Sequence, residues 1–265
     1  MPHITRNGVK VFYECMGQGS PALVFLHPWS TNHYIWANQV NDFARNHRVM
    51  VMDHRGHGQS DKPASGYAIG EMAADVVAAM DAAGIERAVL IGNSIGGMVA
   101  MQTALDAPAR VIANLILSSG TNLGASTPPE VAEAMQKDWR AVFSGLLDAA
   151  IARKSKAEKP EIQAFMEGCF RNETNFTENV FWTSVADPNG VFNWNISDRL
   201  KDIKQPTLII AGVEDGATTV EQNQFLADRI PGSEIKIYQD VGHFCQLEKP
   251  MVFNEDLRAF LRRVA

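Results

Sequence analysis

Short apolar runs alternate with longer amphipathic stretches along most of the chain. Continuous apolar runs are typical of strands that are buried on both faces of a sheet. Residues 22–26 form such a run, and strands are predicted there and over residues 9–15, 48–52, 88–91, 111–117, 206–211 and 234–238. Apolar residues at helical spacing predict helices over residues 35–46, 71–83, 95–106, 220–229 and 252–264. Strands that alternate with helices predict an α/β fold with a mostly parallel central sheet and right-handed crossovers.

The alternation stops between residues 122 and 197. This segment is helical in pattern, rich in aromatic residues and without a convincing strand. A stretch of this length without structure of its own is uncommon inside a domain, so we expect an inserted helical cap at residues 122–197. Residues 1–121 and 198–265 would then form the α/β core around it.

The composition is typical of a globular protein, with 46% hydrophobic and 20% charged residues among 265. A net charge of −6 and the lack of a cationic run argue against nucleic acid as a partner. No window holds the roughly 18 apolar residues that cross a membrane, and the first residues lack a signal-peptide pattern. The cysteines Cys15, Cys169 and Cys245 show no CxxC spacing, which favours a cytoplasmic protein without a zinc site or a disulfide framework.

Gly92-Asn93-Ser94-Ile95-Gly96 fits the pattern G-x-S-x-G between a predicted strand and a predicted helix. So tight a turn leaves no room for side chains two residues before and after the serine, and it lifts the hydroxyl clear of the backbone. We therefore expect Ser94 to be a nucleophile. The helix N-terminus favours negative charge, so the Ile95 N–H is expected in an oxyanion hole. The alternative is a plain glycine-rich turn.

A serine hydroxyl is a weak nucleophile without a base that a third group orients. His243 is the only histidine after Ser94, which makes it the expected base. The acid of such a triad lies between the serine and the histidine, and Asp215 follows the end of a predicted strand there. Two alternatives stay open, its neighbour Glu214 and Asp240, three residues before the histidine; either can be a solvated loop residue.

A second oxyanion donor is expected from the loop after an earlier strand, at His27-Pro28-Trp29. Pro28 has no N–H, so the Trp29 N–H is the candidate, and the Trp29 indole would line the substrate pocket. The aromatic residues of the predicted cap either pack it against the core or face the substrate. Trp139 and Trp182 from this segment, together with Phe244 beside the histidine, are the further candidates for substrate contact.

With these motifs the chain resembles the α/β-hydrolase family over nearly its whole length. The resemblance rests on residues 27–30, 53–60, 92–97, 212–215 and 242–244. It implies an α/β-hydrolase fold in which Ser94 is the nucleophile, Asp215 the acid and His243 the base. It also implies that residues 53–60 form a structural turn, so their histidines are expected to hold no metal. Pro28 stands where the family usually has glycine.

Ser94 argues against two classes of enzyme in this family, the haloalkane dehalogenases and the epoxide hydrolases, because both carry aspartate at that position. Gly92-Asn93-Ser94 is similar to the carbon–carbon bond hydrolases that act on ring-cleavage products. Those enzymes also have a glycine-rich run after the loop histidine and a tryptophan after the catalytic histidine, where this chain has Pro28-Trp29 and Phe244. We therefore favour a serine hydrolase of small carboxylic esters or lactones. A carbon–carbon bond hydrolase and a non-hydrolytic small-molecule receptor are the alternatives.

The acyl-enzyme chemistry of a serine hydrolase requires neither a metal nor an organic cofactor. The expected partner is a small-molecule substrate that is apolar or aromatic. A homo-oligomer is an open alternative to a monomer.

Overall fold

A computed structural model describes residues 2–121, 123–126 and 129–264 of the chain. Its centre is an eight-stranded sheet in the order β1-β2-β4-β3-β5-β6-β7-β8. The strands are β1 (His3–Arg6), β2 (Val9–Met16), β3 (Ala22–Leu26), β4 (Val49–Met52), β5 (Ala88–Asn93), β6 (Val111–Leu117), β7 (Thr207–Gly212) and β8 (Glu234–Tyr238). The two pairs that include β2 are antiparallel, and the other five pairs of this sheet are parallel. The prediction of a mostly parallel α/β sheet is confirmed.

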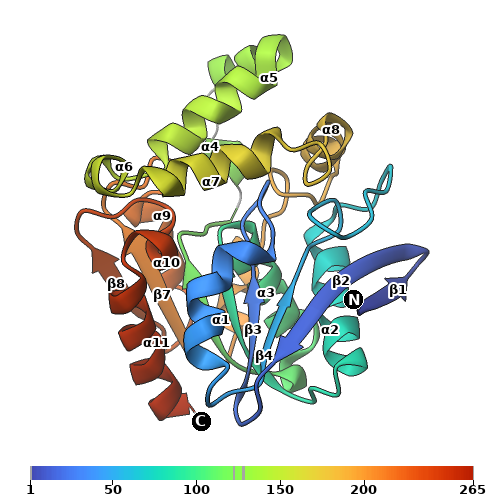
Figure 1. Ribbon diagram of the computed structural model, residues 1–265, viewed down its shortest axis with the longest axis vertical. Coiled ribbons are helices and arrows are strands. Elements are labelled where there is room, and N and C mark those ends of the chain that lie inside the picture. The colour runs from blue at the N-terminus through green and yellow to red at the C-terminus, as the bar shows by residue number, and fades with distance from the viewer. Residues whose placement is uncertain (1, 122, 127–128, 265) are drawn as a thin grey trace.

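Helices cover both faces of this sheet (Figure 1). The helices of this layer are α1 (Ala37–Phe43), α2 (Ile69–Ala82), α3 (Ile95–Asp106), α9 (Val220–Ala227), α10 (Cys245–Glu248) and α11 (Pro250–Val264), with short 3-10 helices η1 (His33–Trp36), η2 (Pro108–Arg110) and η3 (Ser197–Asp202). In Figure 1, α1 and α11 lie in front of the sheet, while α2 and α3 lie behind it. Because both faces are covered, every residue of β4 and β5 is buried, which explains why these strands read as unbroken apolar runs.

In the described part of the chain, five helices lie between β6 and β7, at one end of the sheet (Figure 1). They are α4 (Leu123–Ser126), α5 (Pro129–Ala149), α6 (Arg153–Glu158), α7 (Pro160–Arg171) and α8 (Glu178–Ala186). Helix α5 is broken at Asp138, whose φ of −154° and ψ of 81° are not helical. The Asp138 carboxylate accepts a hydrogen bond from the Ala141 N–H and so starts the second part of the helix.

The described part of the chain contains no helix with both the length and the apolar character needed to traverse a lipid bilayer.

Candidate active site

Ser94 lies in the sharp turn between β5 and α3. Its φ of 56° and ψ of −119° are rarely adopted by a residue with a side chain, and such a conformation costs about 1–3 kcal/mol. A Cβ atom on Gly92 would overlap the carbonyl oxygen of Gly96, and a Cβ atom on Gly96 would overlap the carbonyl oxygen of Leu26. The two glycines of the motif are therefore required by the geometry of this turn.

Hydrogen bonds from neighbouring loops hold the strained turn in place. The Ser94 N–H donates to the Leu117 carbonyl at 2.9 Å, and the Ser119 hydroxyl donates to the Ser94 carbonyl at 2.8 Å. The buried Asn93 amide donates to the carbonyl of His243 at 3.1 Å and so joins the turn to the histidine loop. The roles of Ser119 and Asn93 were missed at the sequence level, where Asn93 was only a variable position of the motif.

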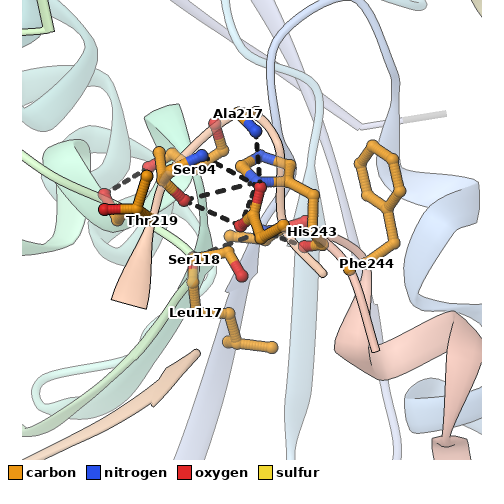
Figure 2. A network of polar contacts seen from close by, with 12 residues as sticks. Ser94, Leu117, Ser118, Ala217, Thr219, His243 and Phe244 are labelled. Atoms are coloured by element: carbon orange, nitrogen blue, oxygen red, sulfur yellow. Dashed lines mark hydrogen bonds and ion pairs between the residues drawn. The ribbon is translucent and has the colours of Figure 1, made fainter. Parts of the chain in front are cut away.

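His243 and Asp215 face each other across two loops that follow β7 and β8. Nδ1 of His243 lies 2.8 Å from Oδ2 of Asp215, and both residues are buried, at 5% and 6% exposure. The carboxylate also accepts the N–H groups of Ala217 and Thr218, at 2.8 and 2.9 Å. Burial works to raise the pKa of the Asp215 carboxyl, but His243 and these N–H groups outweigh it and hold the pKa below its ordinary value. Figure 2 shows Ser94, Ala217 and His243 grouped at this point.

The contact with Asp215 determines which tautomer the neutral His243 imidazole adopts. An ionised carboxylate only accepts hydrogen bonds, so the ring proton of neutral His243 is assigned to Nδ1. Nε2 is then left unprotonated and able to accept a proton from a hydroxyl. The alternative acids lie elsewhere, because Glu214 accepts the Arg153 N–H at 3.1 Å and Asp240 is exposed.

Ser94 and His243 both line a cavity of about 350 Å³. Its apolar wall comes mainly from the segment between β6 and β7, through Leu123, Val131, Met135, Phe143, Leu146, Leu147, Val191 and Phe192. Polar side chains also line it, among them those of Thr218, Thr219 and Gln222. Among the described residues, no Asp, Glu, Lys or Arg lines the cavity. The chamber is therefore apolar and without formal charge beside the imidazole.

Of the two predicted oxyanion donors, Trp29 lines this cavity. Ile95, the first residue of α3, directly follows Ser94. Within the described ranges, neither the Trp29 N–H nor the Ile95 N–H has a hydrogen-bond partner. Both groups are thus available to an incoming oxygen atom, and for Ile95 this is expected of the first N–H of a helix.

The ring of His27 shapes the loop that carries Trp29. Nδ1 of His27 donates to the Pro28 carbonyl at 2.8 Å, and the Thr31 hydroxyl donates to the same carbonyl at 2.8 Å. The Pro28 carbonyl and the Trp29 N–H belong to one peptide group, and in a trans peptide they point in opposite directions. Because these hydrogen bonds hold the Pro28 carbonyl on the side of His27 and Thr31, the Trp29 N–H points to the opposite side. The loop has this orientation although Pro28 stands where the family usually has glycine.

The histidines of residues 53–60 belong to the buried interior. His54 and His57 are fully buried beside His27, and burial lowers the pKa of each of the three to about 3. They are therefore neutral. Asp53 accepts hydrogen bonds from the His33 ring and from the Gln59 N–H, both at 2.8 Å. No group of three or more His, Cys, Asp and Glu residues in the described ranges is arranged to hold a metal.

The aromatic candidates separate into two groups. Trp29 and Phe244 line the cavity, whereas Trp139 and Trp182 do not. The centre of the Phe181 ring, in α8, lies 5.2 Å from that of Trp29 and 4.2 Å from that of Trp139. Trp182 meets the edge of the same ring at 4.9 Å. The expectation that Trp139 and Trp182 face the pocket is therefore corrected, because both pack around Phe181 instead.

Comparison with known families agrees with the fold. The model of the alpha/beta hydrolase fold family matches residues 21–250. The chain belongs to the alpha/beta hydrolase fold family. The predicted family and fold are thereby confirmed.

This alpha/beta hydrolase is similar to several characterised relatives over nearly its whole length. The solved structure of Est816, described as an N-acyl homoserine lactone degrading enzyme, superimposes with a TM-score of 0.96 at 56% identity, over 98% of this chain and 100% of that one. The 3-oxoadipate enol-lactonase 2 of Acinetobacter baylyi is 26% identical over 98% of this chain and 96% of its own length. The 2-hydroxy-6-oxononadienedioate/2-hydroxy-6-oxononatrienedioate hydrolase of Burkholderia vietnamiensis is 30% identical over 96% of this chain and 92% of its own length.

Proposed function

We propose that this alpha/beta hydrolase is a serine hydrolase of uncharged lactones and carboxylic esters with an apolar acyl part. The observation that carries the proposal is the Asp215–His243 contact of 2.8 Å beside a cavity that Ser94 also lines. In this proposal Ser94 is the nucleophile, His243 the base and Asp215 the group that orients the base. Helices α4–α8 act as a cap that encloses the acyl part of the substrate.

The reaction proceeds as acyl transfer in two halves. Nε2 of His243 takes the Ser94 proton while Oγ attacks the carbonyl carbon, and the N–H groups of Trp29 and Ile95 stabilise the oxyanion. Each such donor contributes about 3 kcal/mol in the transition state. The imidazolium then protonates the leaving alkoxide, which opens the ring when the substrate is a lactone. Water that the same imidazole activates attacks the acyl-enzyme and releases the acid.

The charge of the cavity favours one class among the substrates that the relatives suggest. A carboxylate buried without a cationic partner costs several kcal/mol, and no Lys or Arg of the described ranges lines this cavity. The names of the enol-lactonase and the dienedioate hydrolase indicate substrates that carry carboxylates, whereas an N-acyl homoserine lactone is uncharged. The apolar wall along α5 suits an acyl chain, which favours N-acyl lactones as the substrate class.

A matched pair of esters tests this proposal. p-Nitrophenyl hexanoate and mono-p-nitrophenyl adipate differ by one terminal carboxylate. We expect kcat/KM to be at least about 100-fold lower for the adipate, the ratio that corresponds to about 2.8 kcal/mol. N-acyl homoserine lactones should be hydrolysed with a preference for longer acyl chains. Comparable rates for the two esters would contradict the uncharged substrate class, and cleavage of ring-cleavage products alone would favour the carbon–carbon bond hydrolase.

We also propose that the protein is cytoplasmic. Cys15, Cys169 and Cys245 are all free thiols in the structure. Free thiols without any disulfide are typical of reducing compartments. Localisation of a fluorescent fusion in the source cell tests this point.

A further inference from the structure

The connection between α5 and α6 packs directly on the loop that carries His243. The His243 N–H donates to the Ala150 carbonyl at 2.6 Å. A Cβ atom on Gly242 would overlap the same carbonyl oxygen, so a glycine is needed there. Ala149, which precedes Ala150, also lies close to the loop of Asp215, since a Cβ atom on Gly216 would lie 2.8 Å from the Ala149 carbonyl oxygen. The connection thus contacts the loops of both members of the proposed acid–base pair.

The carboxylate of Glu248 joins this connection to the histidine loop. Glu248 ends α10 and is 3% exposed. Its Oε1 accepts the N–H groups of Gly242 and Phe244, on either side of His243, each at 3.1 Å. Its Oε2 accepts the Ala152 N–H, also at 3.1 Å. One buried carboxylate therefore holds both flanks of His243 and the start of α6.

The chemistry of these contacts makes the link stiff. Hydrogen bonds to an ionised carboxylate are stronger than those between neutral groups. If the loop and the connection moved apart, a buried charge would lose its donors, which is costly. Lys159, which follows α6, adds a further tie, because its ammonium group donates to the Glu248 carbonyl at 2.6 Å.

We infer that Glu248 is a positioning residue that holds His243 in line with Ser94 by clamping its loop to the α5–α6 connection. The inference rests on the proposed role of His243 as the base. Helix α5 lines the cavity through Leu146 and Leu147, close to the connection, so contacts of the substrate with α5 reach the base through this clamp.

The test compares three variants with the wild-type protein. Glu248→Ala removes the clamp, and Glu248→Gln keeps the volume but presents an amide N–H₂ to one set of N–H donors. Glu214→Gln is the matched control, because Glu214 accepts the Arg153 N–H of the same connection without contacting residues 242–244. The readouts are kcat and KM for p-nitrophenyl hexanoate, the rate of fluorophosphonate inactivation, the melting temperature and the downfield proton resonance of the His243 Nδ1–H.

A displacement of about 1 Å at a reacting group lowers the rate about 100-fold. We expect Glu248→Ala to lower kcat and the inactivation rate about 100-fold, with KM changed less than about threefold. Glu248→Gln should lower both rates about tenfold and shift the Nδ1 proton resonance, while Glu214→Gln leaves all of these unchanged. If Glu248→Ala does not fold, the isosteric Glu248→Gln decides.

Two results overturn the inference while leaving the proposed function intact. One is a lower melting temperature of the Glu248 variants with wild-type kcat, inactivation rate and Nδ1 resonance, which indicates stability alone. The other is an equal loss of kcat in Glu214→Gln, which indicates a general effect of the connection. A wild-type protein that neither turns over the ester nor reacts with the fluorophosphonate refutes the proposed function, and the inference with it.

Discussion

Three buried histidines make the fold sensitive to mild acid. Burial lowers the pKa of His27, His54 and His57 from 6.5 to about 3, so all three stay neutral in the folded protein in this range. The unfolded chain binds protons on the same side chains as the pH falls through 6.5, and each proton stabilises the unfolded state. The contribution of the three neutral histidines to the free energy of unfolding is therefore fully present above pH 6.5 and is lost progressively as the pH falls towards 3.

The magnitude of the loss is large relative to the stability of a protein. Between pH 8 and pH 5, proton linkage gives about 2 kcal/mol for each histidine and about 6 kcal/mol for the three together. Whole domains are stable by roughly 5–15 kcal/mol. The lowered pKa of Asp215 makes no contribution in this window, because an ordinary aspartate pKa of 3.8 lies below it.

His54→Leu isolates the contribution of one histidine. Neither ring nitrogen of His54 has a hydrogen-bond partner among the described residues, so leucine removes the titrating group without breaking a side-chain hydrogen bond. We expect the loss of unfolding free energy between pH 8 and pH 5 to fall from about 6 to about 4 kcal/mol. Urea unfolding at both pH values, followed by tryptophan fluorescence, measures it.

Two results would refute this reasoning. A wild-type protein that loses less than about 2 kcal/mol between pH 8 and pH 5 would show that the buried histidines take up protons in the folded state. A His54→Leu variant with an unchanged loss would assign the pH dependence to other groups. The slope of free energy against urea should be the same for both proteins, since it reports the surface exposed on unfolding.

Three further substitutions test the site. Asp215→Asn should lower kcat about 10,000-fold, because an amide no longer favours the Nδ1–H tautomer of His243; the pH profile of kcat checks this against the Glu214→Gln control. Ser119→Ala removes the hydrogen bond to the Ser94 carbonyl and should cost about 1 kcal/mol of stability, measured by urea unfolding, with kcat down about tenfold. Leu146→Arg places a cation on the cavity wall and should raise kcat/KM for mono-p-nitrophenyl adipate relative to p-nitrophenyl hexanoate at least about tenfold; an unchanged ratio would remove charge as the basis of selectivity.

The features that depend on nearby residues could be predicted from the sequence. The buried strand β5 and the turn at Ser94 follow from one apolar run and two glycines within a few positions. Strand β1 (His3–Arg6) was missed, because only Ile4 among its four residues is buried and the apolar signal is absent. Its position at the edge of the sheet, paired only with β2, explains the weak pattern.

The features that depend on packing between distant segments could not be predicted. The sequence favoured Asp215 as the acid but left its neighbour Glu214 open, and it is the fold that places the Asp215 carboxylate beside His243, twenty-eight positions along the chain. The orientation of Trp139 depends on Phe181 of another helix. Glu248 reads as an ordinary surface glutamate, since nothing in the sequence shows that three backbone N–H groups surround it.

Fluorophosphonate labelling followed by mass spectrometry tests the central claim most directly, because the probe needs an activated serine and little recognition of the substrate. The account predicts an adduct on Ser94 of the wild-type protein, none in Ser94→Ala, and labelling at least about 1,000-fold slower in His243→Ala. No adduct on folded wild-type protein, an adduct at another residue, or labelling of His243→Ala at the wild-type rate would contradict it.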